Sequence, residues 1–164
     1  MVIKKHKHDH KGAACFVNKA ITLNYLITDL LLDNKTVLIP RPYKPNNTNF
    51  WIYLHKSHSN KYDSSILPLL NTEELYSYIK PENTFLDDKS YIVALCHISD
   101  VLNKQELTES EFNKDILSEM PSKYYWVVDY IYNFRSAFAV SYSHSKTWQL
   151  TRDQRFSLIK TLGV

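Results

Sequence analysis

Glycine and cysteine are both scarce in this sequence of 164 residues, which contains two of each. A glycine-rich phosphate-binding loop needs several glycines, because their backbone can approach a phosphate closely. The P-loop and dinucleotide-binding fingerprints are therefore excluded. The cysteines, Cys15 and Cys96, are too few for a disulfide framework and too far apart for a CxxC metal or redox motif. We interpret both as reduced, buried thiols in a cytosol-like compartment.

Long hydrophobic runs are also missing. The most apolar stretch, residues 20–32, is interrupted by four polar side chains, so no segment reaches the roughly 18 apolar residues of a membrane span. The basic first residues lead into no secretory core, because FVNKAITLNYL contains Asn and Lys. We therefore predict a cytoplasmic protein with no membrane partner.

The composition is that of a globular chain, with 44% hydrophobic and 23% charged residues, which excludes disordered, collagen-like and coiled-coil classes. The length favours one domain, assigned to residues 13–164, after a basic, His-rich segment at residues 1–12. His6, His8 and His10 would share one face of an extended strand and could bind a metal. A terminal tail is the favoured interpretation, and we expect neither a metal nor a cofactor.

Positive charge is concentrated in the first part of the sequence. Residues 1–61 carry ten basic and three acidic side chains, a formal charge of +7, so the remainder carries −4 of the net +3. Such asymmetry is typical of a surface that attracts a polyanion, with the acidic segment Glu106–Glu119 facing elsewhere. Solvated lysines in a chain rich in Lys and Asn explain the asymmetry equally well, because a net charge of +3 is modest for a nucleic-acid-binding protein.

Hydrophobic patterns predict an α+β fold. The predicted strands are residues 13–17, 35–39, 49–55 and 90–98, followed by 124–134 and 137–142, which form either a hairpin or one long bent strand. The predicted helices are residues 19–32, with Asn18 as N-cap, then 72–80, 108–117 and 151–162, and residues 57–71 are a loop. Five or six strands without strict βαβ alternation favour a small mixed or antiparallel β-barrel with flanking helices.

This order of elements resembles the PUA-like superfamily, and most closely its ASCH branch, with EVE and YTH-like modules as relatives. The ASCH proteins carry a helix leading into a G-x-K-T-x-E-x-R type motif, and DNKTVLIPRPYKP is similar to it. Lys35 and Thr36 match the motif, whereas Asn34 replaces the glycine and Leu38 or Ile39 replaces a polar residue. NFWIYLHKS, SYIVALCHISDV and YYWVVDYIYNFRSAFAV resemble the later strands, so the resemblance covers about residues 19–150.

The resemblance implies a β-barrel with flanking helices and a cleft that binds RNA, DNA or a single modified base. Enzymes of the ASCH group are amidohydrolases of modified nucleosides such as N4-acetylcytidine, and they use a Lys and a Thr of the KT motif region with a Glu elsewhere. Lys35 carries over as the catalytic residue if this chain is an enzyme. The position of the catalytic Thr falls on Leu38, and no Glu can be assigned, so enzymatic activity is left open.

Five residues are predicted to bind the ligand: Lys35, Thr36, Arg41, Tyr43 and Trp148. Lys35 and Arg41 lie on a strand and a loop stiffened by prolines, so their charges would be presented to a phosphate or a base edge at little entropic cost. Tyr43 offers a stacking surface, and Trp148 lies in the polar stretch SHSKTWQL, outside any clear strand. Solvated charges on an edge strand and aromatic residues in the core are the competing interpretations.

Other aromatic and titratable residues are less specific. Strand alternation places Trp51 and Tyr53 on one face and Ile52 and Leu54 on the other. Four histidines are scattered along the chain, and Asp100 or Asp129 could serve as acid–base partner if the fold brings the groups within about 3 Å. These histidines are His55, His58, His97 and His144.

Three functions follow from these patterns. The first is a module that binds nucleic acid or a modified nucleotide through a basic cleft and an aromatic pocket, with an affinity that falls with salt. The second is a small nucleoside amidohydrolase or ribonuclease on the same fold, with Lys35 as its central residue. The third is a protein-binding adaptor or inhibitor of viral or mobile-element origin, in which Glu106–Glu119 docks a basic partner.

Overall fold

A six-stranded sheet forms the centre of the protein, in a computed structural model that describes residues 9–57, 90–140 and 147–162. Its strand order is β2-β5-β4-β3-β1-β6, and all neighbouring strands are antiparallel except the parallel pair β1 and β3. The strands are β1 (Lys19–Asn24), β2 (Leu38–Arg41), β3 (Phe50–Ser57), β4 (Tyr91–Asn103), β5 (Tyr124–Ala139) and β6 (Thr147–Gln149). The predicted α+β class with a mixed, barrel-like sheet is confirmed.

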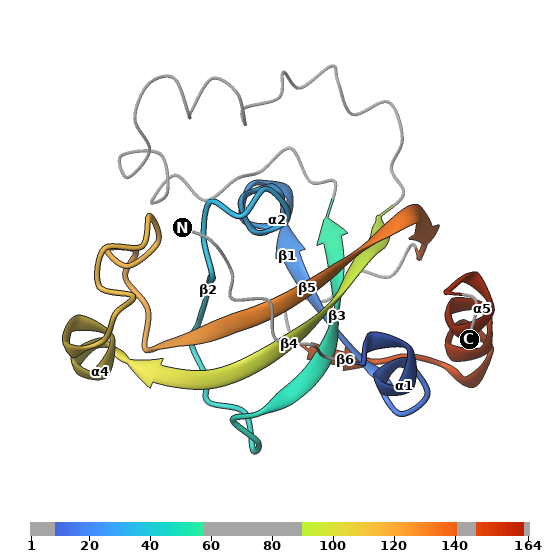
Figure 1. The fold of residues 1–164 in the computed structure, drawn as a ribbon, viewed down its shortest axis with the longest axis horizontal. Coiled ribbons are helices and arrows are strands. Elements are labelled where there is room, and N and C mark those ends of the chain that lie inside the picture. The colour runs from blue at the N-terminus through green and yellow to red at the C-terminus, as the bar shows by residue number, and fades with distance from the viewer. Residues whose placement is uncertain (1–8, 58–89, 141–146, 163–164) are drawn as a thin grey trace.

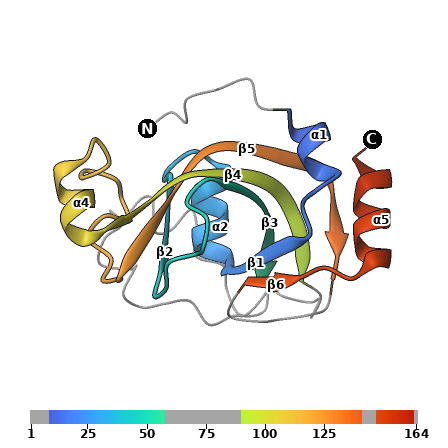
Figure 2. The same cartoon turned by 90° about the horizontal axis from the view of Figure 1, so that it is seen from below.

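The described helices are α1 (His10–Ala14), α2 (Tyr25–Leu32), α4 (Lys104–Glu109) and α5 (Arg152–Thr161). The sheet curls around α2, while α1 and α5 lie outside it (Figure 1, Figure 2). Helix α4 lies at the opposite side of the molecule from α1. No described helix is long and apolar enough to cross a membrane.

The segment from residue 19 to residue 32 corrects the predicted single helix. It forms β1 and then α2, and Asn24, not Asn18, is the N-cap, since its side chain accepts a hydrogen bond from the Ile27 amide at 2.8 Å. Four of the six β1 residues are buried, because both faces of this strand are covered. A strand buried on both faces shows no alternation of polar and apolar residues. The sequence pattern therefore does not separate β1 from the helix that follows it.

Two other helices begin elsewhere than predicted. Residues 10–14 form α1, capped by Asp9, where a strand was expected from residue 13. Helix α4 begins after Asn103, whose side chain forms a capping box with Glu106, so the predicted helix over residues 108–117 is wrong. Both corrections concern short helices fixed by a local cap rather than by a long apolar face.

The long strands agree better with the sequence patterns. Strand β3 lies over the predicted aromatic run, β4 is central and largely buried, and β5 is one continuous strand, which settles the choice between a hairpin and a long strand. Strand β2 is an edge strand, the position that tolerates Pro40. Helix α5 is confirmed, with Leu158 buried and Phe156 62% exposed. The predicted loop over residues 57–71, except for Ser57 in β3, and the helix over residues 72–80 lie outside the described residues.

Two hydrophobic clusters lie on the two faces of the sheet. Ile52 and Leu54 belong to the inner cluster around α2, whereas Tyr53 belongs to the outer cluster beneath α1 and α5, with Trp51 packed against it. The predicted alternation along β3 is thus confirmed. Cys96 is buried in the inner cluster, and this burial raises the pKa of its thiol, but Cys15 is exposed, which corrects one of the two predicted buried thiols.

Side chains join the two edge regions of the curled sheet. The Arg41 guanidinium at the end of β2 donates from Nη2 to the Thr22 carbonyl of β1 at 2.9 Å. Two residues further along, the Tyr43 hydroxyl lies 2.7 Å from Thr147 Oγ1 of β6. These contacts hold the ends of β2 and β6 together, so the sheet is braced like a barrel although β2 and β6 are not paired as strands.

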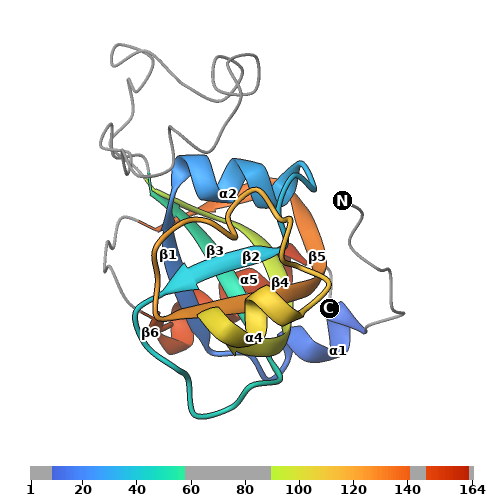
Figure 3. The same ribbon diagram turned by 90° about the vertical axis from the view of Figure 1, so that its left-hand side faces the viewer.

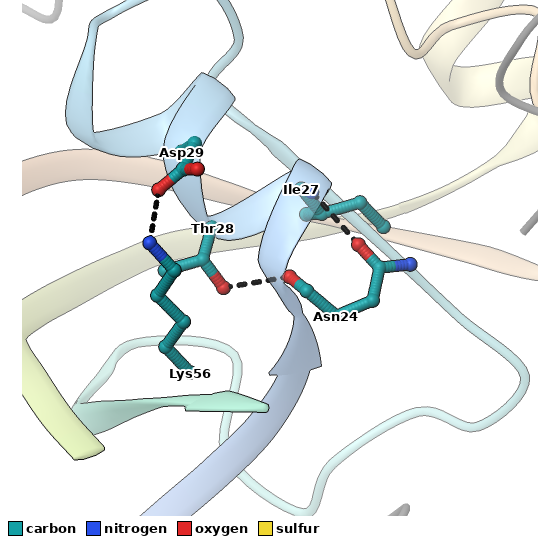
Figure 4. A network of polar contacts seen from close by, with 5 residues as sticks. All are labelled: Asn24, Ile27, Thr28, Asp29 and Lys56. Carbon is teal, nitrogen blue, oxygen red and sulfur yellow. Dashed lines mark hydrogen bonds and ion pairs between the residues drawn. The ribbon is translucent and has the colours of Figure 1, made fainter. Parts of the chain in front are cut away.

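Side-chain contacts hold the N-terminal part of helix α2 in place, as Figure 4 shows. Thr28 donates from its hydroxyl to the Asn24 carbonyl at 2.8 Å, and Asp29 forms an ion pair of 2.6 Å with Lys56 of β3. The two charged side chains are 19% and 14% exposed. Lys56 is therefore engaged within the fold, and its positive charge is largely neutralised.

Replacing Asp29 by asparagine is expected to lower the free energy of unfolding by about 1–3 kcal/mol, because a half-buried ammonium loses its counter-charge. Urea denaturation followed by circular dichroism measures the change. Glu109→Gln, at an exposed position at the end of α4, is the control and is expected to change stability by less than about 0.5 kcal/mol. Equal effects of the two substitutions would contradict the importance of the Lys56 pair.

Candidate functional site

A cavity of about 990 Å³ lies between α1 and the β2–β3 loop. In Figure 1 and Figure 3 these two segments lie at the end of the sheet opposite α2. The lining of the cavity comes from α1 with the connection to β1, from the β2–β3 loop, and from the first residues of β3. Trp126 of β5 and Thr147 of β6 complete it. The volume is at the upper end of the range typical of small-ligand sites.

Aromatic rings form one part of the lining. Tyr43 and Phe50 each contact Trp126 edge-on, with ring centroids 5.5 Å apart in both pairs. Trp126 is 1% exposed, and its indole Nε1 donates to the Tyr43 carbonyl at 3.4 Å. Tyr43 is fixed further by its hydroxyl contact with Thr147. A ligand that stacks on Tyr43 or Phe50 thus meets rings that are already ordered, which lowers the entropic cost of binding.

Trp51 lines the cavity in front of a histidine–aspartate pair. Its ring lies edge-on to His97, with centroids 5.0 Å apart, and to Tyr130 at 5.7 Å. His97 Nδ1 lies 2.7 Å from Asp129 Oδ1, which brings one of the expected histidine–aspartate combinations together. His97 is 6% exposed and does not line the cavity, so in this structure it positions Trp51 rather than meeting a ligand.

Charge and hydrogen-bonding groups surround the aromatic rings. Lys19 and Lys44 are exposed and line the cavity, and Asn18, Asn46 and Asn47 also belong to its lining. Asp9 is the one acidic residue among the described lining residues, and its Oδ1 accepts the Gly12 amide at 2.9 Å, where it caps α1. The cavity therefore combines a small positive charge with several groups that can both donate and accept hydrogen bonds.

Gly12 allows Asp9 to occupy this position. A Cβ at residue 12 would lie 2.3 Å from Asp9 Oδ2, a separation that real side chains do not reach. The scarce glycine of this sequence is thus used where a carboxylate crosses a helix backbone closely. Gly12 therefore shapes the wall of the cavity and is not part of a phosphate-binding loop.

Of the five predicted ligand residues, Tyr43 lines the cavity and the other four do not. Lys35 is exposed, lies in the connection between α2 and β2, and does not line the cavity. Thr36 is fully buried, and its hydroxyl donates to Asp115 Oδ1 at 2.6 Å. Lys35 is therefore exposed to solvent, whereas Thr36 forms a hydrogen bond inside the fold.

Arg41 and Trp148 have structural contacts as well. Arg41 braces β1 through the Thr22 carbonyl, and burial lowers the pKa of its guanidinium. Trp148 lies within β6, not outside the strands, and is 7% exposed. Its indole Nε1 donates to Thr22 Oγ1 at 2.8 Å. Both residues support the edges of the sheet next to the cavity instead of lining it.

His10 belongs to the segment that was considered for metal binding. Its ring stacks on Tyr132, with centroids 3.9 Å apart, and its Nδ1 lies 3.0 Å from the Tyr130 hydroxyl. Burial, together with the neighbouring charge of Lys11, lowers the pKa of His10. His6 and His8 lie outside the described residues, and no group of His, Cys, Asp and Glu within the described ranges could hold a metal ion.

The sequence interpretation missed the cationic and amide residues of the cavity, and also Phe16 and Phe50. Lys44 follows Pro42 and Tyr43 and precedes Pro45, so the same stiff loop that drew attention to Arg41 also presents Lys44. Lys19 and Phe16 carry no comparable local signal. No protein-family model and no curated protein sequence matches the chain.

Proposed function

We propose that this chain is a nucleic-acid-binding module of the PUA-like type, which holds a base or a modified base in the cavity between α1 and the β2–β3 loop. The observation that carries the proposal is the composition of that cavity, whose lining combines ordered aromatic rings with two exposed lysines and three asparagines. Aromatic faces bind any base by stacking, amides recognise base edges, and lysines attract phosphates.

The curled, barrel-like sheet supports this proposal (Figure 2). The residues that supply the positive charge differ from those predicted. Lys19 and Lys44, not Lys35 and Arg41, line the cavity together with the aromatic rings. Since two lysines neutralise about two phosphates, the logarithm of the affinity for a single strand is expected to fall with the logarithm of salt with a slope of about −1.4.

The hydrolase interpretation receives no comparable support. It depends on Lys35, and within the described part of the chain no hydrogen bond or ion pair joins the Lys35 ammonium to another side chain. The residue at the expected Thr position, Leu38, is fully buried in β2. Binding without turnover is therefore the function proposed.

The proposal predicts that the double substitution Lys19→Ala/Lys44→Ala weakens binding of single-stranded RNA or DNA and brings the salt slope close to zero. Fluorescence anisotropy with labelled oligonucleotides of about 12 nucleotides, at low and moderate salt, measures both quantities. Duplex DNA of the same length tests whether free base faces are needed.

Lys114→Ala provides the matched control, because Lys114 is also an exposed lysine but lies in the segment after α4, on the other side of the molecule. It is expected to leave the affinity and the salt slope unchanged. Absence of binding by the wild-type chain to all of these nucleic acids would overturn the proposed function. The adaptor interpretation would then be tested next, by charge reversal at Glu109 or Glu111.

A further inference from the structure

Phe16 is the most exposed large hydrophobic residue of the described chain. It is 83% exposed, and it lines the cavity from the turn that joins α1 to β1. The ring of Phe16 at the rim of the cavity is therefore accessible to a ligand that enters it. Phe156 of α5, at 62%, is the other large hydrophobic residue exposed in the described part. It does not line the cavity, and the Arg152 guanidinium lies 5.6 Å from its ring centroid.

The backbone that carries Phe16 is ordered on both sides. The Phe16 amide donates to the Ala13 carbonyl at 2.9 Å, and the Val17 amide donates to the same carbonyl at 3.1 Å. The preceding Cys15 carbonyl accepts a hydrogen bond from Arg155 Nη2 of α5 at 3.0 Å. Val17 itself is buried, with 9% exposed. The ring is therefore held outward by a braced turn, and its exposure does not result from a frayed chain end.

The groups around Phe16 point to one kind of occupant. Lys19 follows it by three residues at the start of β1, and Lys44 lies on the β2–β3 loop, so positive charge accompanies the apolar ring within one cavity. The single carboxylate of the described lining, that of Asp9, already accepts the Gly12 amide. An apolar ring with cations nearby and aromatic rings deeper in the cavity complements a chain that alternates flat bases with phosphates.

We propose that the ligand is a single strand of nucleic acid with at least two adjacent unpaired bases. One base enters the cavity against Tyr43 and Phe50, and the neighbouring base stacks on Phe16 at the rim, with the intervening phosphate near Lys19. This inference rests on the proposed function and adds to it the strand state and the residue that reads the second base. A base pair in a duplex leaves no free face for Phe16, so duplexes are excluded from this mode.

The test compares Phe16→Ala with Phe156→Ala, two substitutions of exposed phenylalanines, only one of which lines the cavity. Labelled single-stranded RNA and DNA of about 12 nucleotides and a DNA strand of the same length with consecutive abasic sites are titrated against the full chain. Phe16→Ala is expected to weaken binding of the intact strands roughly five- to 150-fold. Phe156→Ala is expected to leave it within about twofold.

Further measurements separate stacking from folding and from simple apolar contact. Circular dichroism of Phe16→Ala is expected to match that of the wild type, because the replaced ring makes few contacts with the fold. Phe16→Leu is expected to bind as weakly as the alanine variant, whereas Phe16→Trp keeps or increases the affinity, because an aromatic face is required. The abasic strand is expected to bind the wild type and Phe16→Ala equally weakly.

The outcomes distinguish this inference from the proposed function. If the wild type binds single strands and Phe16→Ala binds them as well as Phe156→Ala does, the role of Phe16 is overturned while the proposed function stands. If the abasic strand binds as tightly as the intact one, recognition of adjacent bases is wrong and binding is through phosphates alone. If the wild type binds none of the strands, both proposals fail.

Discussion

Replacing Asp115 by alanine is expected to lower the free energy of unfolding by about 3–5 kcal/mol. The carboxylate is 4% exposed and accepts three hydrogen bonds, from Thr36 Oγ1 at 2.6 Å, from the Val37 amide at 3.0 Å and from the Leu117 amide at 2.9 Å. Each buried donor that loses its acceptor costs about 1–3 kcal/mol. Denaturant unfolding monitored by circular dichroism or tryptophan fluorescence measures the loss.

The position of Asp115 explains why its effect is large. Val37 stands just before β2, and its carbonyl accepts the Val128 amide of β5 at 2.8 Å. Asp115 therefore joins the segment after α4 to the point where the edge strand begins. Losing this carboxylate frees both the loop and the start of β2, so the penalty includes part of the strand pairing.

Two matched variants make the prediction specific. Thr36→Val removes one of the three donors and keeps the shape of the side chain, so it is expected to cost about 1–2 kcal/mol. Asp115→Asn keeps the shape of the carboxylate but places an amide NH₂ group among donors, and it is expected to be nearly as destabilising as alanine. The double variant Thr36→Val/Asp115→Ala is expected to cost less than the sum of the single costs. Additive costs would show that the two side chains act independently and would contradict the hydrogen bond.

Sequence patterns predict some elements of this fold better than others. Strand β3, the central strand β4 and helix α5 have an aromatic run, an apolar run and an amphipathic pattern, respectively, and each forms about where predicted. The boundary between β1 and α2 is marked only by the N-cap Asn24, because buried apolar residues lie on both sides of it. The parallel pairing of β1 with β3 then depends on contacts between distant segments.

The candidate site shows why sequence patterns predict the functional residues less well than the strands. Thr36 matches a family motif by sequence, but the acceptor of its hydroxyl, Asp115, is 79 residues away. Trp148 has polar neighbours in sequence, yet its partner Thr22 is 126 residues away. The cavity likewise gathers residues from five separate segments. The sequence predicts Tyr43 as a stacking surface, and Tyr43 lies in a proline-rich loop of the cavity lining.

A chain of hydrogen bonds through Thr22 supports the second large effect, expected at about 2–4 kcal/mol for Thr22→Val. The Val140 carbonyl can only accept, so His55 donates to it from Nε2 at 2.9 Å and accepts at Nδ1 from the Thr22 hydroxyl at 3.0 Å. The Thr22 oxygen in turn accepts the Trp148 indole N–H at 2.8 Å. Valine keeps the shape of the side chain and removes both bonds inside the protein, where Thr22 and Trp148 are less than a tenth exposed.

Thr22→Ser is the control for this chain, because it keeps the hydroxyl and loses one methyl group, at an expected cost of about 1 kcal/mol. Thermal and urea unfolding compare the two variants, and equal losses would show that packing, not the hydroxyl, is responsible. The consequence also reaches the cavity. Trp148 fixes β6, and Thr147 of the same strand holds the Tyr43 hydroxyl at 2.7 Å. Thr22→Val should therefore weaken ligand binding through Tyr43 at temperatures where the variant is still folded, whereas Thr22→Ser should not.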